Sequence, residues 1–297
     1  MPYSTAESNG STTPPSACSA PRGRTTPVAR VRPRASLSLR DFAELWSRRE
    51  LLAILSLRDL RVRFKQTAVG VVWVVLQPLL TVIVFSLLFG RIAGFHSEGV
   101  PYPLFALSGL VAWNYFSQSL GRCVSCLVDA SDLVGKVYFP RLVLPLAAVL
   151  TPLVDLAVTT LILLIVMLAF GFMPTHRLAA LPLIVLWGLL TVLAFGLWLA
   201  VANARYRDIG HALPFFLQIG MYVSPVAYPL DIVPDRWRPL YDLNPMVGVI
   251  GGYRWCLLGT PWDGPAGSWP SLLAVLALVV GGLFALKRGE ETLVDLL

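Results

Sequence analysis

The segment Asp129-Ala-Ser-Asp-Leu-Val-Gly-Lys-Val-Tyr-Phe-Pro-Arg141 is a short polar stretch between two hydrophobic runs. Residues 104–128 precede it and residues 142–171 follow it. Each run is long enough to cross a bilayer, because a spanning helix needs about 20 predominantly apolar residues. The segment therefore predicts two transmembrane helices joined by a loop with its own side-chain chemistry.

That loop carries more polar and aromatic groups than a simple connection between two spans requires. Its charged side chains can make polar contacts, its adjacent aromatic pair can fill an apolar hollow, and its proline suits the first turn of the next helix. The candidate contact residues are Asp132, Lys136, Tyr138, Phe139, Pro140 and Arg141. We expect a docking element for a soluble partner; a plain interfacial turn is the alternative.

The composition indicates a polytopic helical membrane protein. Hydrophobic residues make up 56% of the chain and charged residues 14%. The net charge of +7 lies in residues 1–66, which hold twelve Arg and Lys against five Asp and Glu, whereas the rest of the chain is neutral. A basic excess before the first span predicts an N-terminus on the cytoplasmic side, facing anionic lipid rather than nucleic acid.

Hydropathy divides the chain into three regions. Residues 1–38 are rich in Ser, Thr, Pro and Arg and are expected to form a disordered cytoplasmic tail. Residues 39–66 place apolar and basic residues at helical spacing, which predicts an amphipathic helix in the membrane interface. Residues 67–297 form the membrane domain.

We expect six transmembrane helices in an all-α membrane domain, with both termini in the cytoplasm. With this topology eighteen basic residues fall on the inner side and five on the outer side. The segment between the fifth and sixth spans contains apolar runs too short to cross, which read as re-entrant or interfacial helices. The predicted spans are about 69–89, 104–122, 142–171, 179–202, 212–228 and 272–286.

No catalytic or metal site is expected. The three histidines lie in separate segments, and the four cysteines provide no zinc-type pair of motifs. The chain has no phosphate-binding loop of the G-x-x-x-x-G-K-[ST] type, so ATP-driven transport would need another chain. Asp155 lies near the middle of the third span, where a carboxylate must face the bundle interior or water. It is either a pathway group or a packed, hydrogen-bonded side chain.

Aromatic and amide side chains recur together in the second and fifth spans. Aromatic faces can stack on sugar rings while amides and phenols bond their hydroxyls, so this mixture suits a sliding glycan. An interfacial aromatic belt or ordinary helix packing is the alternative. The residues concerned are Trp113, Tyr115, Phe116, Gln118, Phe215, Phe216, Gln218 and Tyr222.

Six motifs stand out along the chain. They are Arg58-Asp-Leu-Arg-Val-Arg-Phe-Lys-Gln-Thr-Ala-Val-Gly-Val-Val-Trp-Val-Val-Leu-Gln-Pro78, Trp113-Asn-Tyr-Phe-Ser117, Lys136-Val-Tyr-Phe-Pro-Arg-Leu-Val-Leu-Pro145, Arg205-Tyr-Arg-Asp208, Ser224-Pro-Val-Ala-Tyr-Pro229 and Leu243-Asn-Pro245. In these motifs, which match in order and register, the chain from residue 41 onward resembles the membrane subunit of polysaccharide-exporting ABC transporters.

The resemblance implies a homodimer in the bacterial cytoplasmic membrane with two copies of a nucleotide-binding subunit. ATP and Mg would bind that partner, and the cargo would be a lipid-linked glycan such as O-antigen or teichoic acid. Residues 129–141 would be the coupling helix seated in the ATPase. The channel would lie at the dimer axis between parts of spans one, two and five, which adds Gln77 to its candidate lining.

The resemblance also implies outer gate helices within residues 229–258. The candidate gate residues are Pro225, Pro229, Asn244 and Pro245. Two other functions remain open at this stage: export of a lipid or drug, and a membrane enzyme acting on a lipid-linked substrate. The enzyme would need paired acids or a metal set on one membrane side, and the sequence offers only the acids Asp231, Asp235 and Asp242 beside two arginines.

Overall fold

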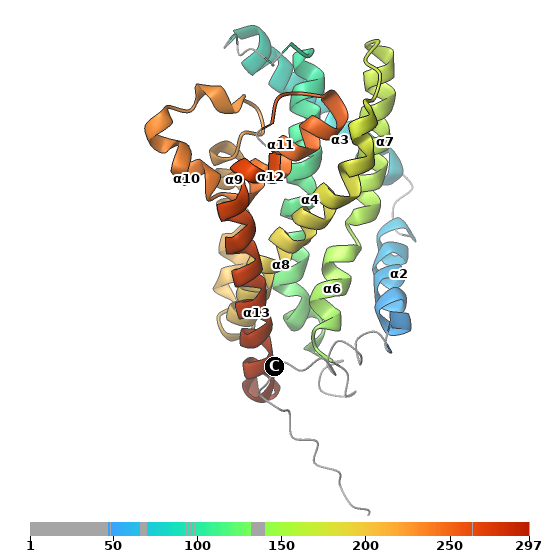
Figure 1. Ribbon diagram of the computed structural model, residues 1–297. Helices are drawn as coiled ribbons and strands as arrows, with labels where there is room; N and C mark the ends of the chain where they lie inside the picture. Colours follow the sequence, from blue (N-terminus) through green and yellow to red (C-terminus); the bar gives the residue numbers. More distant parts are fainter. Residues whose placement is uncertain are drawn as a thin grey trace, which may run out of the picture. The chain divides into compact units, whose positions relative to one another are not determined.

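A computed structural model describes residues 47, 49–65, 70–92, 94, 97, 99–131, 140–262 and 264–296. Within these ranges all regular structure is helical and no strand occurs (Figure 1). The α-helices are α2 (Arg49–Lys65), α3 (Gly70–Phe85), α4 (Tyr102–Asp129), α6 (Val143–Leu150), α7 (Leu153–Ala169), α8 (Leu181–Arg205), α9 (Asp208–Val223), α10 (Arg238–Asp242), α11 (Pro245–Leu258), α12 (Gly264–Gly267) and α13 (Trp269–Leu296).

Helix α4 is the centre of the packing. It contacts α3, α6, α7, α8, α9 and α11, and Figure 1 shows it between these helices. Leu104, Phe105 and Leu127, near its two ends, are fully buried. On the same helix Asn114 is half-buried and Gln118 is exposed, so part of the surface of α4 stays uncovered.

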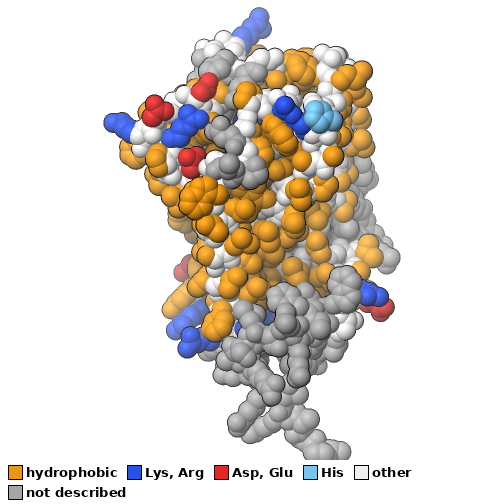
Figure 2. Space-filling model, viewed as in Figure 1, with side chains coloured by type: hydrophobic (Ala, Val, Ile, Leu, Met, Phe, Trp, Pro, Cys, Tyr) orange, Lys and Arg blue, Asp and Glu red, His pale blue; other side chains and the backbone are white. Residues whose placement is uncertain are grey.

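Three helical stretches are long and apolar enough to cross a membrane: Val143–Ala169, His176–Arg205 and Trp269–Gly289. The helical stretch Leu76–Ile92 is apolar but shorter. Figure 2 shows hydrophobic side chains over the middle of the visible face and charged side chains toward its ends. These features indicate an integral membrane protein, whereas the count of six spans stays a prediction.

The third predicted span, residues 142–171, consists of two helices rather than one. Helix α6 ends at Leu150, a turn follows at residues 151 and 152, and α7 begins at Leu153. Pro152 lacks the backbone N–H that a continuous helix would bond to the preceding turn. At the break the Thr151 hydroxyl donates a hydrogen bond to the Ala147 carbonyl in the last turn of α6, at 2.9 Å.

Helix α2 lies within the second predicted region, residues 39–66, and packs against α6. Its apolar side chains do not gather on a single face: Leu55 is buried, whereas Ile54 and Leu57 are exposed. Its position in a membrane interface stays a prediction, and residues 1–46 lie outside the described part of the chain.

The buried side chain of Asn203 joins three helices. From α8 its amide nitrogen donates to the Val124 carbonyl of α4 at 3.1 Å, and its amide oxygen accepts from the Gly210 N–H of α9 at 2.8 Å. A Cβ at Gly210 would lie 2.9 Å from that oxygen, so the contact needs glycine there. One amide therefore fixes the turn between α8 and α9 onto α4.

Candidate functional site

The predicted docking segment is only partly described. Asp132, Lys136, Tyr138 and Phe139 lie outside the described residues, and Pro140 and Arg141 are half-buried before α6. The Val143 N–H donates to the Pro140 carbonyl at 3.0 Å. Helices α4 and α6, which lead into and out of the segment, pack against each other. The role of the segment stays a prediction.

A loop of residues 224–228, which we call the clamped loop, follows the end of α9. Two buried side chains hold its backbone. The Tyr102 hydroxyl donates to the Ala227 carbonyl at 2.7 Å, and an Arg254 guanidinium nitrogen donates to the Val226 carbonyl at 2.6 Å. The donors come from α4 and α11, so the loop is tied to two helices that are far apart in the chain.

Arg254 is buried to 5% exposure in an otherwise apolar helix. Its guanidinium carbon lies 3.5 Å from the centroid of the Phe105 ring, a cation–π geometry that stabilises a desolvated cation. Gly109 leaves the space that this arrangement needs. A Cβ there would lie 2.5 Å from the Val226 carbonyl oxygen and 2.7 Å from the Arg254 guanidinium.

Tyr228 closes the clamped loop by hydrogen bonds of its hydroxyl. The hydroxyl lies 2.8 Å from that of Tyr241, and 3.0 and 3.1 Å from the carbonyls of Tyr222 and Val223. These hydrogen bonds tie the loop to the end of α9 and to α10.

The four predicted gate residues lie together around this loop. Pro225, Pro229 and Pro245 are buried and Asn244 is half-buried. Helix α11 has 14 residues, about 21 Å at 1.5 Å per residue, which is shorter than a bilayer core. A gate function and a re-entrant position remain predictions for these elements.

Asn244 connects the clamped loop to α11 through both ends of its amide. Its oxygen accepts from the Met246 N–H at 3.0 Å as an N-cap, and its nitrogen donates to the Ser224 hydroxyl at 3.1 Å. We expect Asn244→Ala to lower the free energy of unfolding by about 1–2 kcal/mol, because it removes a helix cap and leaves buried Ser224 without this donor.

Chemical denaturation of the purified protein measures this effect, with Asn244→Asp as the matched variant. Aspartate keeps the cap acceptor and loses the donor to Ser224, so its loss should lie between those of wild type and alanine. Equal stability of the alanine variant and wild type would contradict the assignment.

The candidate channel residues divide into two groups. Trp113, Tyr115 and Phe116 are buried within the single chain. By contrast, the α9 residues Phe215, Phe216 and Tyr222 are 62%, 64% and 57% exposed. The glutamines at 77, 118 and 218 are also exposed. A channel lining made from these residues stays a prediction.

A cavity of about 290 Å³ lies among α4, α8, α9 and the start of α11. Trp113, Phe116 and Phe195 form part of its wall, and the ring centroids of Trp113 and Phe116 are 5.3 Å apart. A Cβ at Gly220 would lie 3.0 Å from the Trp113 ring, so α9 approaches α4 closely at this point. The lining is almost wholly apolar, which suits a hydrocarbon chain better than a sugar.

Asp155 lies in the first turn of α7 at 7% exposure. The side chain is thus buried within the helix bundle, three residues after the break at Pro152. A pathway role for Asp155 stays a prediction.

Within the part of the chain that the structure describes, no three His, Cys, Asp or Glu side chains group to hold a metal ion. The residues that sequence reasoning missed are Tyr102, Gly109 and Arg254. The signal for Arg254 was available, since it is a single arginine inside an apolar run. Nothing in the sequence links it to residues 224–228.

Residues 50–258 match the family described as ABC-2 type transporter. The O-antigen export system permease protein RfbA of Myxococcus xanthus is 33% identical over 219 residues, covering 73% of this chain and 83% of the relative. The polysialic acid transport protein KpsM of Escherichia coli is 26% identical over 241 residues, covering 80% and 92%. The match includes α2, α4 and the clamped loop, and the chain belongs to the ABC-2 type transporter family.

Proposed function

We propose that this chain is the membrane subunit of a transporter that exports a lipid-linked polysaccharide across the bacterial cytoplasmic membrane. The observation that carries the proposal is the 33% identity to an O-antigen export permease over 83% of that relative's length. A second relative, named for polysialic acid transport, is matched over 92% of its length. One name describes export of O-antigen and the other transport of polysialic acid.

The proposed assembly has two copies of this chain and two copies of a nucleotide-binding subunit that holds ATP and Mg. Each chain crosses the membrane six times with both termini in the cytoplasm. Uncovered side chains of α9, among them Phe215, Phe216 and Tyr222, support a second copy on this face, because such apolar surface marks an interface or lipid. The glycan would pass between the copies, along the exposed amides of Gln118 and Gln218.

In this proposal residues 129–141 transmit ATP hydrolysis to the membrane helices, and residues 229–258 gate the opposite side. The clamped loop supports the second assignment, because four buried or half-buried side chains fix it between α4, α9 and α11. Movement of any of these helices would therefore reach the loop directly.

The double substitution Tyr138→Ala with Phe139→Ala tests the coupling role. We expect it to weaken association with the ATP-binding protein encoded by a neighbouring gene and to abolish surface glycan in a deletion strain. The physical reason is the loss of the only adjacent aromatic pair in residues 129–141, the part that can fill an apolar hollow on the partner. Co-purification, ATP turnover and a blot for surface polysaccharide measure the three effects.

The matched control replaces Phe170 and Met173 by alanine. Both are exposed apolar side chains beyond the end of α7, outside the proposed coupling, channel and gate residues. A wild-type chain that purifies without any ATPase partner, or a deletion strain with normal surface glycan, would refute the exporter assignment. Surface lipid or drug-efflux defects in place of a glycan defect would assign a different cargo.

A further inference from the structure

A second cavity, of about 300 Å³, lies between the segment after the clamped loop and helix α11. Unlike the apolar cavity beside α9, it combines charged, hydroxyl and aromatic groups. Its polar lining comprises Asp231, Arg238, Asp242, Arg254, Thr260 and Ser268. We call it the mixed-charge pocket. Its volume lies at the lower end of the range of about 300–1,000 Å³ for small-molecule sites, which suits one ring rather than a polymer.

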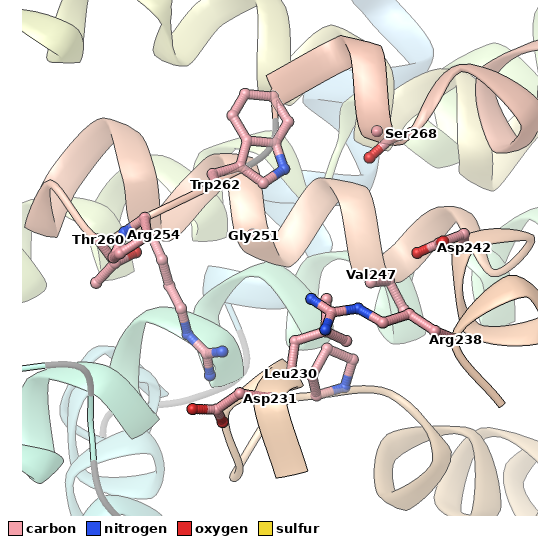
Figure 3. Close-up of a pocket in the computed structure, with 13 residues that line it drawn as sticks. Leu230, Asp231, Arg238, Asp242, Val247, Gly251, Arg254, Thr260, Trp262 and Ser268 are labelled. Carbon is pink, nitrogen blue, oxygen red and sulfur yellow. The ribbon is translucent and has the colours of Figure 1, made fainter. Parts of the chain in front are cut away.

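One cation of this pocket is held in place by the surrounding fold. Arg254 is fixed by the Val226 carbonyl and the Phe105 ring. Figure 3 shows Arg238 extending from α10 into the middle of the pocket, with the Arg254 guanidinium and Asp231 carboxylate pointing toward one another beside it. An arginine held in this way loses little further side-chain freedom when a ligand enters.

Trp262 gives the pocket an aromatic wall on the side away from Asp231 (Figure 3). Its ring centroid lies 5.5 Å from that of Trp255 and 6.4 Å from that of Trp187. Glycines of α11 allow this packing, since a Cβ at Gly251 would lie 3.0 Å from the Trp262 ring. The indole is therefore a fixed apolar surface, of the kind on which a sugar ring can lie.

The charges in the pocket balance. Two carboxylates, Asp231 and Asp242, face two guanidinium groups, and Arg254 already donates to a backbone carbonyl. An anionic ligand would gain no net attraction from such a set, whereas hydroxyl groups can both donate to carboxylates and accept from Arg238. The lining chemistry thus favours a neutral polyol over a charged ligand.

We propose that the mixed-charge pocket binds a neutral hexose unit of the glycan that the chain exports. The inference rests on the proposed function for the identity of the cargo, and the pocket itself is argued from its lining. A sugar held beside the clamped loop would contact Arg254 and hence the backbone at Val226. Glycan bound in this pocket would therefore act on the clamped loop, where the proposed gate is held.

The test uses the full-length chain, with its ATPase partner, in lipid nanodiscs free of sugar-headed detergent. The probes are the methyl glycosides of glucose, galactose and mannose, with methyl β-D-glucuronide as the acidic counterpart of the glucoside. Saturation-transfer NMR titration measures binding. We expect at least one neutral glycoside to bind saturably and the glucuronide to bind more weakly.

Each pocket substitution has a control substitution of the same type nearby in the chain. Arg236 lies two residues from Arg238, and Asp235 lies seven residues from Asp242. Arg238→Gln and Asp242→Asn remove groups that line the pocket, whereas Arg236→Gln and Asp235→Asn change exposed residues of the same segment outside it. We expect about tenfold weaker binding for the first pair, the loss of one hydrogen bond to a charged group, and no change for the second pair. The thermal unfolding midpoint identifies any misfolded variant. If one of the two pocket variants fails to fold, the variant at the other pocket position tests the same prediction.

No saturable binding of any neutral glycoside would overturn the proposal, as would tighter binding of the glucuronide or equal effects of Arg238→Gln and Arg236→Gln. The proposed function is scored separately, by restoration of surface glycan in the deletion strain. Normal export without sugar binding refutes the pocket alone. Sugar binding without export refutes the exporter assignment and leaves a sugar site.

Discussion

Gly109→Ala should lower the thermal unfolding midpoint of the purified chain by roughly 5–10 °C, equivalent to about 2–3 kcal/mol of overpacking. The new Cβ would lie 2.5 Å from the Val226 carbonyl oxygen, a backbone atom that no rotamer change can move. It would also lie 2.7 Å from the guanidinium of Arg254. The substitution therefore has to displace the clamped loop from α4.

Gly121→Ala is the matched control for this prediction. Gly121 belongs to the same helix, and a Cβ there has no neighbour within 4 Å. Alanine in a helix interior is favoured over glycine by about 0.5–1 kcal/mol, so this variant should be as stable as wild type or slightly more stable. If the two variants unfolded at the same temperature, the close approach of α4 to the clamped loop would be refuted.

Arg254→Met should cost about 3 kcal/mol and should also disturb export in cells. Methionine retains much of the side-chain volume but loses the hydrogen bond to the Val226 carbonyl and the cation–π contact with Phe105. Leaving a buried carbonyl without its hydrogen-bond donor lowers the free energy of unfolding by about 1–3 kcal/mol. Losing a desolvated cation–π contact lowers it by about 2 kcal/mol. Chemical denaturation and surface-glycan blots measure the two consequences.

The combined variant Gly109→Ala with Arg254→Met distinguishes this explanation from general damage. Both changes act on the Val226 carbonyl, and removing the guanidinium also removes one of the two clashes of the alanine Cβ. The combined loss of stability should therefore be smaller than the sum of the single losses, whereas independent sites would add. Strict additivity would show that the three residues do not form one unit.

Much of the helical architecture could be predicted from hydropathy, because α8 and α13 contain apolar stretches that are long enough to cross a membrane. The break in the third predicted span could have been placed at Pro152, since proline removes a backbone donor. Hydropathy alone does not show that α4 is enclosed by six other helices, because burial among protein and exposure to lipid select similar side chains.

The site was less predictable, for a reason visible in Trp113 and Phe216. Both are aromatic residues at the predicted membrane depth, and nothing local to either distinguishes the buried one from the exposed one. The contacts of Arg254 depend on residues 28 and 145 positions away, Val226 and Gly109. Long-range pairs of this kind are settled by how the helices pack, which a single sequence does not display.

The amide of Asn203 has a mechanical consequence for the molecule. Because it hydrogen-bonds to the Val124 carbonyl and the Gly210 N–H at once, α4 near its Asp129 end and the first turn of α9 cannot slide past each other without breaking at least one of these bonds. A displacement of that end of α4 would therefore be passed on to α9, whose last residue, Val223, directly precedes the clamped loop.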